Sequence, residues 1–128
     1  MRSNRTYNIC ESAILVIYYL KGKIRLNKIE GIEEDKFWDS LFSFSLEKIR
    51  QYKSQNKHFY FAKSNNKKIT TGGHIDDSLY KKAMEIRKEH KFKIYEFVEL
   101  SLYLYAREVL TDKEIEFFEI ELWGIMIN

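Results

Sequence analysis

Residues that are mostly apolar recur with helical spacing along two neighbouring runs in the second half of the chain. The first run, at steps of four, three and four residues, comprises Leu79, Ala83, Ile86 and His90. The second run has the same periodicity and comprises Ile94, Phe97, Val98, Ser101, Leu102 and Tyr105. Such spacing places each set on one face of a helix. We therefore predict a first helix over residues 79–90, a tight turn, and a second helix over residues 94–105.

The residues before the first helix carry a helix-start signal. Asp76, Asp77 and Ser78 can accept hydrogen bonds from the free N–H groups of a first helical turn, and the carboxylates suit its positive end. Residues 68–75 are predicted to form a short strand. The second helix is apolar nearly all round, so either a second copy of the chain or the rest of this chain has to cover it.

The order of strand, helix, tight turn and helix over residues 68–108 resembles the ribbon-helix-helix family, the Arc and MetJ type of DNA-binding protein. Without a gap, Ile75 falls on the last strand residue and the two helical runs fall on the two helices of the family. The resemblance implies an obligate homodimer whose chains each contribute one strand to an antiparallel ribbon. That ribbon enters the major groove of double-stranded DNA.

Site residues follow from the same resemblance. The strand residues facing the bases would be Thr70, Gly72 and His74, and those facing the core would be Ile69, Thr71, Gly73 and Ile75. The start of the second helix, where a phosphate binds, would comprise Lys93, Ile94 and Tyr95. Lys67 and Lys68 would contact the flanking DNA backbone. The leading prediction is therefore a DNA-binding transcriptional regulator that acts as a homodimer.

Two features of this stretch favour an alternative. Lys91 occupies the turn, where the family usually carries a left-handed glycine, and Gly72 and Gly73 lie mid-strand, where glycine packs nothing. A degenerate module would serve dimerisation only, in a small protein-binding inhibitor or adaptor of a virus, phage or plasmid. A plain helical hairpin inside an α+β domain would show the same periodicity.

Residues 1–65 are predicted to form a small helical or α+β region. Residues 1–9 are polar and expected to be frayed, whereas residues 11–20 are apolar enough for a buried helix or a buried strand. We favour a helix that ends at Gly22. A second helix is expected from about residue 33 to residue 53, then a strand over 58–62 and a turn or hinge at 64–66. This order suits a winged-helix-like domain or a layer that covers the central module.

Residues 111–128 form the third segment, after the N-terminal region 1–65 and the module 66–110. Thr111 and Glu114 fit a capping box at a helix start. Residues 115–127 fit a helix, or a strand with one slip at Phe117-Phe118, and we favour the helix. Trp123 would dock on the core or on a protein partner. The fold class expected is α+β and mostly helical, and no internal repeat is evident.

Charge is distributed unevenly along the chain. Basic residues outnumber acidic ones by twelve to seven in residues 1–65 and by nine to seven in residues 66–110, whereas residues 111–128 carry one basic residue against five acidic ones. A basic body suits an anionic partner. Abundant Lys, Glu, Ile and Tyr with no proline is typical of thermophiles or of AT-rich genomes, including mobile elements.

The sequence argues against an enzyme. His58, His74 and His90 lack metal-ligand spacing, and the chain has neither a phosphate loop nor a nucleophile elbow, so we expect no metal and no cofactor. The single cysteine, Cys10, rules out an internal disulfide and favours a reducing, cytoplasmic compartment. The apolar run over residues 12–20 is too short to span a membrane, so no membrane partner is expected.

Overall fold

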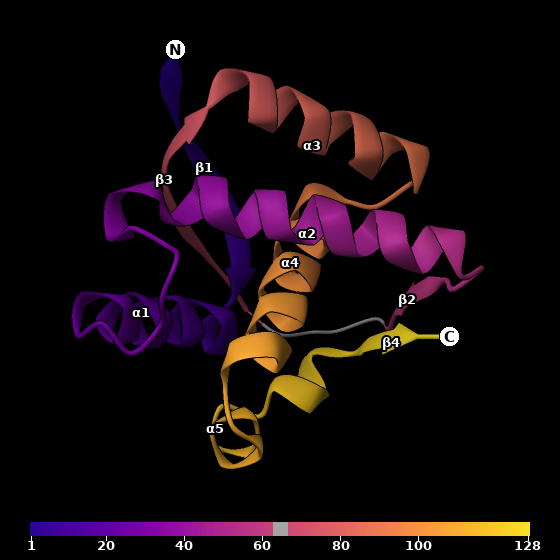
Figure 1. Cartoon of the computed structure of the whole chain (residues 1–128). Coiled ribbons are helices and arrows are strands. Elements are labelled where there is room, and N and C mark those ends of the chain that lie inside the picture. Colours follow the sequence, from indigo (N-terminus) through magenta and orange to yellow (C-terminus); the bar gives the residue numbers. More distant parts are fainter. Residues whose placement is uncertain (63–66) are drawn as a thin grey trace.

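The computed structural model of the chain describes residues 1–62 and 67–128 and has an α+β fold in which helices predominate (Figure 1). In chain order the elements are β1 (Arg2–Cys10), α1 (Glu11–Arg25), η1 (Glu34–Lys36), α2 (Phe37–Ser54), β2 (Phe59–Phe61), β3 (Lys68–Asp76), α3 (Asp77–Glu89), α4 (Ile94–Val109), α5 (Asp112–Phe117), η2 (Ile120–Trp123) and β4 (Ile125–Ile127). The turn or hinge expected at residues 64–66 lies outside the described residues.

Two antiparallel strand pairs join segments that are far apart in the sequence. β1 pairs with β3 along its whole length, from Arg2 opposite Asp76 to Cys10 opposite Lys68. The prediction that residues 1–9 are frayed is therefore wrong. These residues are ordered because Tyr7 and Ile9 are buried against the core and β3 supplies hydrogen-bonding partners for the backbone.

The N-terminal helices lie close to their predicted positions. α1 confirms the helical alternative for residues 11–20, but it continues past Gly22 to Arg25, and the chain turns at Asn27, whose φ is 57°. A Cβ at Gly22 would have no heavy atom within 4 Å, so neither packing nor a turn demands glycine there. η1 and α2 together confirm the helix predicted over residues 33–53.

α3 and α4 occupy the two helical runs of the central module. Asp76 Oδ2 accepts a hydrogen bond of 3.0 Å from the Leu79 N–H, which confirms its capping role. Lys91 adopts the left-handed conformation at φ 60° in the turn between them. The Arg87 guanidinium braces this turn by donating to the carbonyl oxygen of Phe92 at 2.9 Å.

The C-terminal segment differs from the predicted helix over residues 115–127. The capping box is confirmed, but α5 ends at Phe117 because Glu119 turns the chain at φ 54°. Gly124, at φ 81°, then directs residues 125–127 into β4, which pairs with β2. Residues 125–127 form a strand and do not continue the helix because β2 pairs with them. β2 is distant in the sequence, so this partner is available only in the folded chain.

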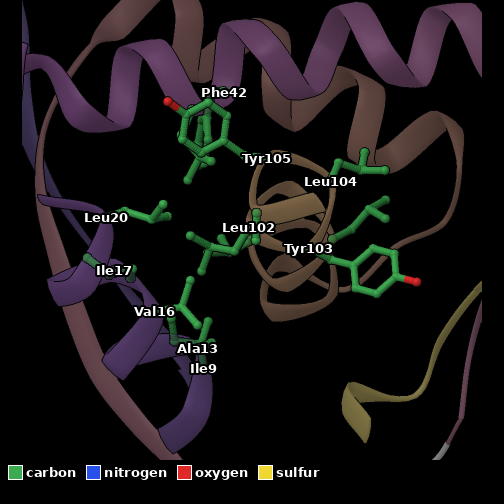
Figure 2. Packing of buried hydrophobic residues seen from close by; sticks show 14 of the residues in the cluster. Ile9, Ala13, Val16, Ile17, Leu20, Phe42, Leu102, Tyr103, Leu104 and Tyr105 are labelled. Carbon is green, nitrogen blue, oxygen red and sulfur yellow. The ribbon is translucent and has the colours of Figure 1, made fainter. Parts of the chain in front are cut away.

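The hydrophobic core is built around α4. Ten consecutive residues of this helix are buried, from Phe97 to Ala106. Figure 2 shows Leu102 of α4 pointing toward Val16 and Leu20 of α1. The other elements packed on α4 include α2 and β1, so the chain itself covers the helix that is apolar nearly all round. All three expected segments contribute side chains to this one core.

Within residues 1–62 and 67–128, none of the helices has both the length and the apolar character needed to cross a membrane.

Candidate nucleic-acid interface

β1 and β3 form a two-stranded ribbon with one exposed polar face and one face packed on helices. Thr70 and His74 of β3 are exposed, whereas Ile75 is fully buried. Alternate residues of β1 are exposed in the same way, beginning at Arg2. We call the outward-facing residues the outer ribbon face: Arg2, Asn4, Thr6, Asn8, Thr70, Gly72 and His74.

Residues of the outer ribbon face lie opposite one another in cross-strand pairs. These pairs are Asn4 with His74, Thr6 with Gly72, and Asn8 with Thr70. Thr70 Oγ1 donates a hydrogen bond of 2.6 Å to Asn8 Oδ1. Amide, hydroxyl and imidazole groups together present both donors and acceptors, which is the chemistry that reads base edges in the major groove.

Close contacts with neighbouring elements explain both glycines of β3. A Cβ at Gly73 would lie 2.7 Å from two atoms of the Trp38 ring, and a Cβ at Gly72 would lie 2.0 Å from the carbonyl oxygen of Arg5 on β1. The strand pairing runs through both glycines without interruption. They therefore do not spoil the strand; they let a ring and a neighbouring backbone approach it closely.

Aromatic packing holds the ribbon on α2. The ring of Tyr7 lies 4.9 Å from that of Trp38 and 5.8 Å from that of Phe42, centroid to centroid. Burial raises the pKa of the Tyr7 hydroxyl, which keeps it neutral in the core. On the same inner face the Arg5 guanidinium stacks over the Tyr80 ring of α3 at 4.2 Å.

A carboxylate closes each end of the ribbon. At one end Asp39 of α2 accepts hydrogen bonds from the Asp76 N–H at 2.9 Å and from Arg2 Nη1 at 2.5 Å. At the other end Glu99 of α4 accepts from the Cys10 N–H at 2.9 Å and from Lys68 Nζ at 2.7 Å. Each carboxylate thus binds the last N–H of one strand and the first side chain of the other.

The two ends are related by an approximate two-fold symmetry of the chain. β1 and β3 each have nine residues, and the first residue of each strand lies opposite the last residue of the other. In this register, a half-turn about the Thr6–Gly72 pair relates each residue of β1 to the residue 66 positions later. Both strands lead directly into a helix, and a second long helix follows. The chain thus contains two strand–helix–helix units, β1–α1–α2 and β3–α3–α4.

The two second helices start beside opposite ends of the ribbon and differ in charge. Near the start of α4, the ammonium groups of Lys68 and Lys93 lie 4.3 and 5.8 Å from the Tyr95 ring, and Lys67 and Ile94 are exposed. The structure thus brings Lys68, Lys93 and Tyr95 together. The start of α2 is preceded instead by Glu33, Glu34 and Asp35.

Sequence reasoning missed the β1 half of the outer ribbon face. Asn4, Thr6 and Asn8 alternate with the inward-facing Arg5, Tyr7 and Ile9, and this period of two was the available signal. It was weak because the inward positions near Arg2 are polar. Arg2 itself is held in place: its guanidinium donates to Asp39 and to the carbonyl oxygens of Asp35 and His74.

The titratable groups beside the ribbon favour a structural role. Burial, reinforced by the Glu99 carboxylate, raises the pKa of the Cys10 thiol, which keeps it protonated and weakly nucleophilic. In the part of the chain that the structure describes, no three His, Cys, Asp or Glu side chains are grouped as metal ligands would be. Comparisons of this chain with protein-family models, curated proteins and solved structures found no match.

Proposed function

We propose that this chain is a DNA-binding regulator of the ribbon-helix-helix type, in which one chain supplies both strands of the ribbon. The observation that carries the proposal is the outer ribbon face, where two paired strands present exposed amide, hydroxyl and imidazole groups. Further support comes from the strand–helix–helix order of both units and from the starts of α2 and α4 beside the ends of the ribbon.

A two-stranded ribbon fits the major groove, which is about 12 Å wide in B-DNA. Side chains at alternate positions would then point at base edges. The amides of Asn4 and Asn8 suit the paired donor and acceptor of adenine, and an imidazole N–H of His74 suits a purine N7 acceptor. Thr70 and Thr6 offer both a hydroxyl and a methyl group, and the methyl group suits contact with thymine.

Phosphate contacts would supply much of the affinity. Lys67 and Lys93 are exposed, and Lys93 immediately precedes α4, whose first N–H groups suit a phosphate. Lys68 is expected to contribute less, because its ammonium group already binds Glu99 at 2.7 Å. Affinity of this origin falls steeply as salt concentration rises.

The assembly expected from the fold is a single chain. β1 lies beside β3 where the strand of a second chain would lie in a homodimer, and the chain covers its own α4. A second copy is not needed to complete either the ribbon or the core. We therefore propose a single chain as the smallest DNA-binding unit, in place of the obligate homodimer that the family resemblance implied.

The test is a titration of labelled random-sequence duplex with the purified chain at salt concentrations of about 50 and about 200 mM. The variant Lys67→Ala/Lys93→Ala is compared with Lys57→Ala/Lys113→Ala, which removes the same charge from exposed lysines before β2 and on α5. Figure 1 shows both of these elements away from the ribbon.

We expect wild-type binding to weaken steeply with salt. The first variant should bind about tenfold or more weakly at low salt, with a salt slope reduced by about two, whereas the control variant should match the wild type. Equal losses in the two variants would contradict a specific phosphate contact near α4. No salt-dependent binding of the wild type to any duplex would overturn the proposal itself.

A second candidate function is protein binding through the C-terminal segment. Phe117 and Leu122 are 78% and 72% exposed, and Leu122 lines a hollow together with carboxylates that include Glu116 and Glu121. A basic partner with apolar side chains would suit this surface. Deleting the segment is a poor test because Ile120, Trp123 and Ile125 belong to the core. The variant Phe117→Ser/Leu122→Ser should instead abolish capture of a partner, and unchanged capture would place the partner elsewhere.

A further inference from the structure

We infer that one chain reads a DNA site that is not palindromic, and that it binds this site in a single orientation. The inference rests on the proposed function and adds to it the kind of site that is read. It follows from a contrast on the ribbon: the backbone has approximate two-fold symmetry, but the side chains displayed on it do not.

The symmetry of the backbone would by itself favour a palindrome. Each outward position of β1 has a symmetry-related position 66 residues later on β3. A symmetric ribbon presents equivalent groups to the two halves of a duplex, which is why symmetric DNA-binding dimers read palindromic operators. The base preference of each half-site then depends on which side chains occupy the related positions.

Related positions on this ribbon carry different side chains. Asn4 corresponds to Thr70, Thr6 corresponds to Gly72, and Asn8 corresponds to His74. One end of the outer ribbon face therefore displays Asn4 beside His74, and the other end displays Asn8 beside Thr70. At the centre only Thr6 has a side chain, because Gly72 must leave room for the backbone of β1.

The two ends also differ in which hydrogen-bonding groups are free. Thr70 Oγ1 is already bonded to Asn8 Oδ1 at 2.6 Å, so these two side chains are oriented before DNA arrives. At the other end, the Arg2 guanidinium already donates hydrogen bonds to Asp39 and to two backbone carbonyl oxygens. The base-reading groups left at that end are those of Asn4 and His74.

Charge next to the ribbon reinforces this polarity. Lys67, Lys68 and Lys93 lie on the side where β3 and α4 begin, next to the Asn8–Thr70 pair. Glu33, Glu34 and Asp35 lie on the opposite side, before α2 and next to the Asn4–His74 pair. Lys36 and Arg25 pair with Glu33 and Glu34, so the second side has little free charge. Phosphates are attracted to the first side and not to the second, so the two orientations of the chain on a duplex differ in energy.

The experiment selects duplexes from a random pool with the purified full chain and then determines the mass of the complex and the base preferences. Two variants are selected in parallel, Asn4→Ala/His74→Ala and Asn8→Ala/Thr70→Ala. The four residues are exposed, so each variant should unfold at nearly the same temperature as the wild type.

We expect one chain per duplex and a site without internal symmetry. Each double variant should lose about 5- to 150-fold of base discrimination in one half of the site only, and the two variants should affect opposite halves. A third variant, Asn8→His/Thr70→Asn, makes the two ends alike in these side chains and should shift the selected site toward a palindrome.

Two results would overturn the inference while leaving the proposed function standing. One is a palindromic wild-type site occupied by two chains, and the other is loss of discrimination in both halves by a single double variant. If no duplex is enriched and none is bound at low salt, the proposed function fails, and the inference fails with it.

Discussion

Gly72 and Gly73 are the residues at which neighbouring elements come closest to β3. The backbone of β1 lies against Gly72, and the Trp38 ring lies against Gly73. The obstacle at Gly72 is a backbone carbonyl held in a strand ladder, which has little freedom to move aside. These glycines are thus required by packing, whereas Gly22 in α1 is not.

We predict opposite effects of alanine at these positions. Gly72→Ala should lower the free energy of unfolding by about 2 kcal/mol or more, because the added Cβ forces β1 and β3 apart. Gly22→Ala should raise it by about 0.5–1 kcal/mol, because alanine favours a helix and meets nothing. Denaturant titration measures both, and a tolerated Gly72→Ala would contradict the close approach.

Glu114 is the carboxylate with the strongest set of partners at the α1–α5 contact. Burial opposes its ionisation, but the Lys23 ammonium at 2.8 Å, the Thr111 N–H at 2.8 Å and the Tyr19 hydroxyl outweigh it and lower its pKa from 4.5 to about 2. A carboxyl with a depressed folded-state pKa stabilises the fold above its unfolded pKa, and this stabilisation is lost as pH falls toward the folded value.

We predict that Glu114→Gln loses about 1–2 kcal/mol of stability at neutral pH. The difference from wild type should shrink as pH falls from about 4.5 and vanish near pH 2. Unfolding titrations across this range measure it, with Glu116→Gln on the exposed side of α5 as the control. A stability difference between Glu114→Gln and the wild type that persists at pH 2 would show that the charge of Glu114 is not its cause.

At the scale of elements, two long helices hold the ribbon by its ends. Asp39 of α2 and Glu99 of α4 perform equivalent tasks, although Asp39 is the third residue of its helix and Glu99 the sixth. Glu99 is 5% exposed, so its hydrogen bonds to the Cys10 N–H and to Lys68 form out of contact with water. Removing this carboxylate would leave a buried donor and a half-buried ammonium without an acceptor.

We predict that Glu99→Ala lowers the free energy of unfolding by about 2–4 kcal/mol. The matched control is Glu108→Ala on the same helix, which removes a surface ion pair to Lys48 at 4.0 Å and should cost less than about 0.5 kcal/mol. The denaturant midpoints of unfolding of the two variants measure this difference in stability. Similar losses would mean that the end of the ribbon is not held by Glu99.

At the scale of the whole molecule, the hydrophobic core links regions that the sequence divides into three. β1 pairs with β3 across the intervening N-terminal helices, and β4 pairs with β2. Side chains from residues 1–65, 66–110 and 111–128 all enter the same cluster around α4. A core shared in this way favours unfolding in one cooperative step.

The two tryptophans test this cooperativity. Trp38 lies under the ribbon and Trp123 lies in the C-terminal segment, so Trp38→Phe and Trp123→Phe each leave one fluorescent reporter in a different region. In each variant we expect the fluorescence transition and the helical circular-dichroism transition to have the same denaturant midpoint. A C-terminal reporter that changes before the helices unfold would instead identify 111–128 as a separate unit.

Sequence patterns predicted the helices well and the strand partners poorly. The helix starts at Asp76 and Thr111 were predictable because a cap and the N–H groups it binds lie within three residues of each other. Lys91 departs from the glycine that the family usually carries, yet it adopts the left-handed conformation that the turn between α3 and α4 requires. The family resemblance assigned Thr70 and His74 to the outward face of β3, and both are exposed.

The strand partner of β3 and the equivalence of the two units depend on contacts that form only in the folded chain. β1 lacks a strong pattern of its own and becomes a strand because its backbone pairs with β3, about 60 residues away or more. The two strand–helix–helix units show no evident sequence repeat; their equivalence rests on the register of one ladder and on the carboxylates at its ends.

Local interactions thus determine the helices and their caps, because the groups involved are neighbours along the chain. Only the tertiary structure decided what lies beside β3 and what covers α4. Both outcomes depend on which distant segments fit together, since Gly73 accepts the Trp38 ring and Gly72 accepts the backbone of β1. That fit brings Asn4, Thr6 and Asn8 alongside Thr70 and His74 on one surface.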